Sequence, residues 1–436
     1  MCQSARNMNA RGALSQVRLA FRTDKPNEKL SGSSLSDREN VRKGLSVRVA
    51  TTFQGVEDLR PVWKGWPHGL DTDIDYYMHN LRSDSTILGP HVITIWEDGI
   101  AQAMLIGQVR RQRISTNVSF IHLWGPIARV LEIVSGARIG RQSSAIDKLL
   151  ALELLKVTND GDVDLVCFQR LPLHSELFYE VQQLPGLFGR KRVPHLSNYS
   201  VLSLTAPGGK HPAFGGKSRR EVRRKARILQ RTFPSKVRLE CYSHPSELDV
   251  GIRDVMPVAA KTWQFRLGCC SLSDTAQTRD SLKFFAKRGW LRIYVLYLDN
   301  FPCAFLIGQL YHQSFYCQHA GYDPDFARFS VGSLLTAWAL EELAVAGVEQ
   351  VDLGEGRQEH HRRLGCQMRQ EGTVHLYSRT WGGIWLNMLF AATMFVRAGA
   401  HHTLSGLRLN GVGKNWRPSL MAPGQGGKRL PNLPPF

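Results

Sequence analysis

Two stretches far apart in the chain share one pattern. Residues 95–108 read IWEDGIAQAMLIGQ, and residues 296–309 read LYLDNFPCAFLIGQ. Aligned without gaps, both have an aromatic residue second, an acidic residue fourth and LIGQ last. Each consists of two apolar runs around a turn, at Asp98-Gly99 or at Asp299-Asn300, and so predicts a β-hairpin. The match indicates an internally duplicated unit.

The segments after each hairpin follow the same order. After Gln108 come the strand-like NVSFIHLW, the apolar helix SAIDKLLALELLKV and the short strand VDLVCF. After Gln309 come SFYCQHAGY, the helix VGSLLTAWALEELAVAG and the strand VEQVDLG. Both copies therefore read β-β-β-α-β, which predicts an α/β (α+β) fold built from two modules.

Composition divides the chain into four parts. Residues 1–47 are polar, Arg-rich and aperiodic and predict a disordered basic leader, although such a stretch could also pass for a transit peptide. The Gly/Pro-rich stretch 206–216 is expected to separate an N-terminal module, residues 48–205, from a C-terminal module, residues 206–398. Residues 399–436 are expected to form a tail rich in Pro and Gly.

The chain is strongly basic, with 56 Lys and Arg against 37 Asp and Glu and a net charge of +19. This excess favours an anionic partner, such as a nucleotide cofactor, nucleic acid, an acidic glycan or a membrane surface, or else serves only solubility. Eight cysteines without a C-x-x-C pair predict free thiols and a cytoplasmic location. No zinc-ligand spacing or G-x-S-x-G motif occurs, so we expect no metal and no serine nucleophile.

The loop before the second long helix could bind a phosphate. In YDPDFARFSVGSLLTAW, residues 322–338, a strand ends near Gly321 and a helix begins at about Gly332. A helix N-terminus carries unpaired N–H groups and partial positive charge. Arg328 adds a cation, and Gly332 removes a side chain where a backbone could meet an anion. The alternative is an ordinary Ser/Gly helix cap.

This order of strand, loop, helix and VDLGEG resembles the GNAT acetyltransferase fold, and more closely its CelD/BcsL-like subgroup of cellulose and exopolysaccharide biosynthesis. The subgroup pattern is carried by AGYDPDFARFSVGSLL, by DLGEGRQEHHRRLG and by the Arg-rich helix KSRREVRRKARILQR. The resemblance spans about residues 47–390. It implies two tandem GNAT-like modules, each a mixed central sheet flanked by helices. It also implies acetyl-CoA or another acyl-CoA as co-substrate, its pyrophosphate bound by Arg328, Phe329, Ser330, Val331, Gly332 and Ser333.

The end of the strand after this helix offers candidate catalytic residues. Asp352 and Glu355 lie where α/β folds bind ligands, and a carboxylate there could accept the proton of an attacking amine or hydroxyl. The alternative for Asp352 is a strand-end turn that it caps. His360 and His361 stand where the resemblance implies Tyr-Lys, and either imidazole could donate a proton to the leaving thiolate. That departure could instead mean a changed substrate or lost activity.

The segment 217–231 predicts a basic helix that holds an anionic substrate. It contains eight Lys and Arg against one acid, Glu221, with an apolar side formed by Val222, Ala226 and Leu229. Its candidate substrate-binding residues are Lys217, Arg220 and Arg224. The alternative is a solvated cationic face.

A last apolar segment, near residues 381–396, predicts a C-terminal helix that carries Trp381, Trp385, Phe390 and Phe395. Core packing is the favoured expectation, and membrane docking is the alternative. No apolar run is long enough to span a bilayer, so peripheral contact is the only membrane role left open.

These features predict a bacterial, acyl-CoA-dependent N- or O-acyltransferase, with acetyl as the expected group, that acts on a sugar, polysaccharide precursor or related small acceptor by direct transfer. The first module, without an acid at the end of its equivalent strand, is expected to be structural or to shape the substrate site. One alternative is a FemAB-like aminoacyl-tRNA-dependent transferase, in which the basic helix holds tRNA. The other is a non-catalytic scaffold or glycan-binding protein of exopolysaccharide assembly.

Overall fold

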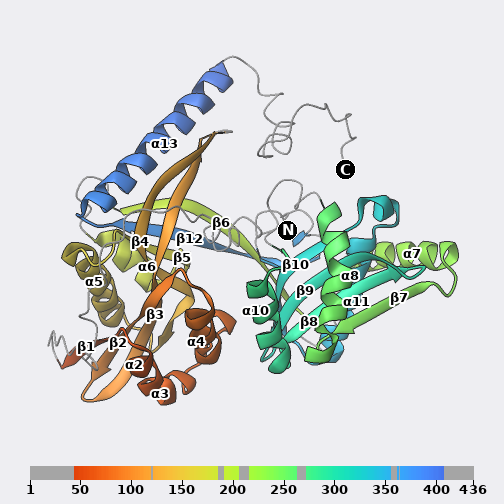
Figure 1. Ribbon diagram of the computed structural model, residues 1–436, viewed down its shortest axis with the longest axis horizontal. Coiled ribbons are helices and arrows are strands. Elements are labelled where there is room, and N and C mark those ends of the chain that lie inside the picture. Colours follow the sequence, from red (N-terminus) through yellow and green to blue (C-terminus); the bar gives the residue numbers. More distant parts are fainter. Residues whose placement is uncertain are drawn as a thin grey trace.

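The computed structural model describes residues 44–118, 121–184, 191–205, 216–262, 272–354, 361–362 and 364–406. Its centre is one mixed sheet of twelve strands flanked by helices, in the order β1-β2-β3-β4-β5-β12-β6-β11-β10-β9-β8-β7. Figure 1 shows two halves, orange to yellow and green to cyan, joined by strands that cross between them. The predicted mixed α/β architecture is confirmed.

In the described ranges, the N-terminal half contributes six strands and six helical segments. They are β1 (Leu45–Ala50), α2 (Phe53–Asp58), α3 (Arg60–Lys64), η2 (Leu70–Thr72), α4 (Ile74–Ser83), β2 (Ile87–Glu97), β3 (Ile100–Val118), β4 (Ile121–Gly140), α5 (Ser144–Asp160), β5 (Leu165–Pro172), α6 (Glu176–Gln183) and β6 (Lys191–Ser203). Its core packs α4 and α5 on the sheet through residues such as Tyr77, Leu150 and Ile106.

The C-terminal half repeats the pattern. Its elements are α7 (Gly216–Thr232), β7 (Val237–Tyr242), η4 (Pro245–Glu247), α8 (Leu248–Lys261), α10 (Ala276–Lys287), β8 (Leu291–Leu298), β9 (Phe301–Tyr311), β10 (Ser314–Tyr322), η5 (Pro324–Phe329), α11 (Val331–Val345), β11 (Gln350–Asp352), β12 (Gln367–Tyr377) and α13 (Trp381–Gly406). The order β-β-β-α-β predicted for both copies is confirmed by β2-β3-β4-α5-β5 and β8-β9-β10-α11-β11.

Both predicted hairpin turns form, for a local conformational reason. Asp98 and Gly99 have φ of 49° and 78°, and Asp299 and Asn300 have φ of 52° and 66°. Two consecutive residues of positive φ define the type I′ turn, which matches the twist of paired strands and favours Asp, Asn and Gly.

The repeated LIGQ has a packing reason. A Cβ on Gly308 would lie 2.4 Å from the Phe315 ring and from the Tyr316 carbonyl, and one on Gly107 would lie 2.9 Å from Ile133. The missing side chain therefore leaves room for the Phe315 ring and the Tyr316 carbonyl at Gly308, and for the Ile133 side chain at Gly107.

The two halves exchange a strand each. β12, from the C-terminal half, pairs with β5 and with β6, while β6, from the N-terminal half, pairs with β12 and with β11. β6 and β12 are the strands that cross the middle of Figure 1. The module boundaries stay a prediction, but the sheet passes without a break from one module to the other. The helix α13 itself runs through residue 398, where the C-terminal module was expected to end.

Candidate functional site

The turn between β10 and α11 brings the six predicted cofactor-binding residues together. Asp323 begins the turn by accepting a hydrogen bond from the N–H of Asp325 (3.0 Å). Ser330 then adopts φ 56° and ψ 39°, a left-handed conformation that is uncommon for a non-glycine residue, and α11 begins at Val331.

The first turn of α11 leaves donors available. Its first helical hydrogen bond runs from the N–H of Leu334 to the carbonyl of Ser330 (3.1 Å). Within the described ranges, no protein group accepts a hydrogen bond from the N–H of Val331, Gly332 or Ser333. These N–H groups, at the positive end of the helix dipole, can bind an anion.

The neighbouring side chains have definite places. The exposed Arg328 guanidinium lies 4.7 Å from the Phe329 ring centroid, and Phe329 meets Phe233, just after α7, edge-on at 5.3 Å. Gly332 faces Tyr322, whose ring carbon would lie 3.1 Å from an added Cβ. The glycine therefore makes room for Tyr322 in this structure.

Next to this turn, β10 and β11 separate. They pair in parallel only over Ser314–Tyr316 and Gln350–Asp352, whereas β10 continues to Tyr322. The register of β10 against β9 also shifts between Cys317 and His319, so β10 is bulged at the point of separation. A bulge re-aims side chains and ends pairing, which opens a wedge between the two strands.

Asp352 lies at the base of this wedge, and both of its carboxylate oxygens have partners. One carboxylate oxygen accepts the N–H of Gly354 (2.7 Å), and the other pairs with the Arg170 guanidinium (3.1 Å). The first contact is the strand-end turn that the sequence left as an alternative. Both carboxylate oxygens of Asp352 therefore already have partners. Proton abstraction by Asp352 stays a prediction.

Arg170 links Asp352 to the N-terminal half. It extends from β5, donates to Glu371 of β12 (2.9 Å) and lies 3.9 Å from the Tyr199 ring centroid of β6. Burial raises the pKa of Glu371, and the Arg170 charge opposes that effect. The nearby carboxylates of Asp352 and Glu371 raise the pKa of Arg170, although its burial opposes them. Sequence spacing offered no signal for this cluster, because its members come from four strands.

Of the other three predicted catalytic residues, only His361 is among the described residues. Glu355 and His360 lie outside the described residues. His361 is described, and its side chain is fully buried at 0% exposure. A role for it as a proton donor to a bound thiolate stays a prediction, and complete burial suits a packing residue better.

The basic helix α7 is amphipathic as expected. Leu229 is buried, and Val222 and Ala226 pack against the core that also contains α11. Arg220 and Arg224 are exposed, so both the substrate-binding and the solvated-face interpretations remain open. The side chain of Lys217 lies outside the described set.

A polar cavity that sequence reasoning missed lies between the halves. It encloses about 250 Å³ and is lined from one side by α4, β3 and β4 and from the other by α10 and the β10 bulge. Glu132 accepts hydrogen bonds from Gln108 (2.9 Å) and Gln169 (2.8 Å), and Arg110 pairs with Asp84 (2.7 Å). Gln108 ends the first LIGQ, so the repeat marked one residue of its wall.

The β10 bulge contributes Gln318 and His319 to the same cavity. Gln318 accepts a hydrogen bond from Gln309, the last residue of the second LIGQ (2.6 Å). Burial lowers the pKa of His319 to about 4, which leaves the imidazole neutral at neutral pH. In the sequence, His319 is one polar residue inside a strand, and nothing there indicates a bulge.

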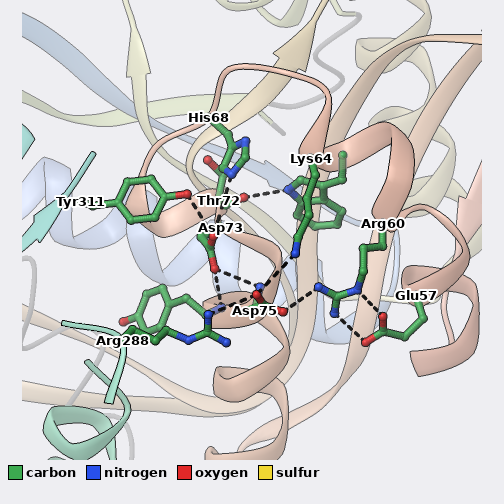
Figure 2. Close-up of polar contacts among 11 residues, drawn as sticks. Glu57, Arg60, Lys64, His68, Thr72, Asp73, Asp75, Arg288 and Tyr311 are labelled. Atoms are coloured by element: carbon green, nitrogen blue, oxygen red, sulfur yellow. Dashed lines mark hydrogen bonds and ion pairs between the residues drawn. The ribbon is translucent and has the colours of Figure 1, made fainter. Parts of the chain in front are cut away.

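A polar joint beside the cavity connects the halves (Figure 2). Asp73, at the start of α4, accepts a hydrogen bond from Tyr311 of β9 (3.0 Å), and Asp75 pairs with Arg288 (3.2 Å). The same Asp75 carboxylate pairs with Arg60 (2.6 Å). The Asp73 carboxylate, 3.9 Å from His68 Nε2, raises the pKa of His68, so opposite charges also meet at this joint.

Comparisons with known proteins agree with this geometry. Residues 216–362 match the family described as acetyltransferase (GNAT) domain. No curated protein matches the sequence. The fold is similar to that of FemX, at 8% identity and a TM-score of 0.51 over 75% of this chain and 97% of FemX. The predicted CelD/BcsL-like subgroup is not part of these findings.

Two further solved structures are more distantly similar. A tandem GNAT protein from the clavulanic acid biosynthesis pathway shares 11% identity at a TM-score of 0.43, over 76% of this chain and 98% of its own. L-PGS from Bacillus licheniformis shares 13% identity at a TM-score of 0.45, over 78% and 96%. Residues 216–362 match an acetyltransferase (GNAT) domain, and by that match the protein is an acyltransferase.

Proposed function

We propose that the protein transfers an acyl group, most simply acetyl, from acyl-CoA directly to an amine or hydroxyl of a sugar or polysaccharide precursor. The observation that carries this proposal is the open N-terminus of α11 beside the wedge between β10 and β11. The N-terminus of α11 offers anion-binding N–H groups at one end of β10. The bulge of the same strand faces the cavity between the halves.

The residues at the turn fit the phosphates of CoA. The N–H groups of Val331, Gly332 and Ser333 point out of the helix end, and Arg328 is exposed next to them. Bound acyl-CoA would supply the activated acyl group as a thioester. Tyr322 follows His319 by three positions, about 10 Å along an extended strand, so the turn and the cavity are close enough to serve one elongated molecule.

The cavity suits a polar acceptor. Amide and carboxylate groups such as Gln108, Glu132 and Gln318 can hydrogen-bond hydroxyls or amines, while Tyr76 and Phe285 add aromatic surface to the wall. His319, neutral and in the wall, is the candidate that accepts the proton of the attacking group. No cysteine or serine of the sequence stands in a recognisable nucleophile motif, which supports direct transfer.

A charge change at Ser333 tests CoA binding. Ser333→Glu places a carboxylate in the first turn of α11, where it favours the helix but repels a phosphate. We expect isothermal titration calorimetry to show acetyl-CoA binding by the wild type and at least tenfold weaker binding by this variant, since a factor of ten needs only about 1.4 kcal/mol.

Ser333→Gln, which is neutral and of similar size, is the matched control and should bind like the wild type. Gly332→Glu is less useful, because its side chain would meet Tyr322. Failure of the wild type to bind, or equal binding by the Glu and Gln variants with unchanged melting temperatures, would remove the basis of the proposal.

A FemAB-like aminoacyl-tRNA-dependent transfer is the second candidate. The fold likeness to FemX and the exposed arginines of α7 favour it. RNA that copurifies with the protein, and binding that weakens steeply with salt and with Arg220→Glu and Arg224→Glu, would support this candidate. Glycan binding without any release of CoA thiol would instead support a scaffold of exopolysaccharide assembly.

The cellular location and the class of acceptor are proposals too. Free thiols at Cys167, Cys241, Cys303, Cys317 and Cys366 suit a reducing compartment, and we propose a bacterial cytoplasm. The CelD/BcsL-like resemblance is the reason to propose an exopolysaccharide precursor as acceptor.

A further inference from the structure

One face of α13 is apolar and exposed. Trp381, Ile384, Trp385 and Met388 are 89, 44, 57 and 61% exposed. They recur at helical spacing and form a stripe along one side, whereas Leu386 and Phe390 on the other side pack against the β3–β4 hairpin. The expectation of core packing was therefore wrong for Trp381 and Trp385 and right for Phe390, while the side chain of Phe395 lies outside the described set.

The start of α13 fixes which side faces outward. Added Cβ atoms on Gly382 and Gly383 would lie 2.5 Å from the Asp164 carboxylate and 2.3 Å from the Ser378 hydroxyl. Thr380 donates a hydrogen bond to Asp164 (2.8 Å) and accepts one from the N–H of Gly383 (3.0 Å). The helix cannot turn its tryptophans inward without breaking these contacts. Figure 1 shows α13 in blue, running beside the hairpin and away from the rest of the molecule.

The charge of this part of the chain identifies the partner. Glu371 is the last acidic residue of the sequence, and every charged residue after it is a cation: Arg379, Arg397, Arg408, Lys414, Arg417, Lys428 and Arg429. Arg379, two residues before the stripe, is exposed. An apolar stripe with tryptophans in an acid-free, basic segment matches an anionic bilayer surface, where indole rings occupy the headgroup region and cations meet lipid phosphates.

We infer that the stripe of Trp381, Ile384, Trp385 and Met388 docks the protein on an anionic lipid surface. The helix then lies along that surface, because its opposite side stays packed on the β3–β4 hairpin. Among the helices of the described ranges, none is long and apolar enough to cross a membrane. This inference is independent of the proposed acyl transfer.

Vesicle flotation with the full chain tests the docking. The wild type should float with vesicles of phosphatidylcholine and phosphatidylglycerol, and less with phosphatidylcholine alone or at high salt. Trp381→Ser combined with Trp385→Ser should lower partitioning onto the anionic vesicles at least about tenfold. Two indoles that insert into the bilayer contribute far more binding free energy than the roughly 1.4 kcal/mol that a tenfold change in partitioning requires.

The matched control is Phe301→Ser, which removes an aromatic side chain that is 68% exposed at the start of β9. It should float like the wild type. A wild type that does not bind anionic vesicles, or a double variant that binds them equally well, overturns the inference. So does a dimer of the wild type in velocity sedimentation that the double variant abolishes, since the stripe would then be a contact between copies.

Discussion

His319 is the residue whose chemistry depends most on its surroundings. A one-residue irregularity in β10 directs its imidazole into the wall of the cavity between the halves. Burial lowers its pKa to about 4, so the side chain stays neutral over the range in which an ordinary histidine takes up a proton. A neutral imidazole beside a polar cavity can remove a proton from an amine or hydroxyl.

We expect His319→Gln to lower kcat about 100-fold or more, the usual contribution of general base catalysis, with little change in acetyl-CoA affinity. Because its pKa is about 4, the wild-type rate should stay level from pH 8 down to about 5 and fall below that. A rate that falls with a midpoint near 6.5, or an unchanged kcat in the variant, would contradict this role.

The same pKa has a consequence for stability. The pKa in the folded state lies below the unfolded value of about 6.5, so folding disfavours the protonated imidazole. The contribution of the neutral His319 to the stability of the folded state is therefore complete above pH 6.5 and is lost as the pH falls toward 4. Thermal unfolding of wild type and His319→Gln at pH 7 and pH 4.5 should show a smaller acid effect in the variant.

At the scale of elements, the sheet is held at its centre by one guanidinium. Arg170 of β5 contacts Asp352 of β11, Glu371 of β12 and Tyr199 of β6, so four strands meet on a single side chain. These strands bring together sequence from both halves. The pairing of Arg170 compensates two carboxylates that would otherwise face each other in a partly buried place.

Arg170→Ala should lower the free energy of unfolding by about 3 kcal/mol, because it leaves buried carboxylate charge without a partner. Urea unfolding should show a lower midpoint. Arg253→Ala, which removes an exposed guanidinium from its pair with the adjacent Asp254, is the control and should leave the midpoint in place, since Asp254 keeps its hydrogen bond from Tyr297. Equal midpoints for all three proteins would mean that the central cluster does not stabilise the sheet.

Elements with local causes could be predicted from the sequence, and those with distant causes could not. The turns at Asp98-Gly99 and Asp299-Asn300 depend on two residues each, and the helices α5, α7 and α11 follow from apolar spacing. The pairing of β12 with β5 joins residues about 200 positions apart and leaves no periodic trace. The candidate site divides in the same way: the turn before α11 is contiguous in sequence, whereas the cavity is assembled from both halves.

The described residues form one sheet with hydrophobic clusters in both halves. The Asp73–Tyr311 hydrogen bond and the Arg288–Asp75 ion pair tie the halves together near the cavity (Figure 2), and the exchange of β6 and β12 makes the connection continuous. Neither half is complete by itself, because each lacks the strand that the other supplies.

During translation, this exchange delays completion of the first half. β5 and β6 leave the ribosome long before β12, so a nascent chain presents two unpaired strand edges until residues 367–377 have been synthesised. A polypeptide that stops after Cys366 should therefore be recovered mainly in the pellet of a cell lysate, whereas one that stops after Gly406 should be recovered in the supernatant. Similar recovery of both would show that the early-synthesised strands need no late partner.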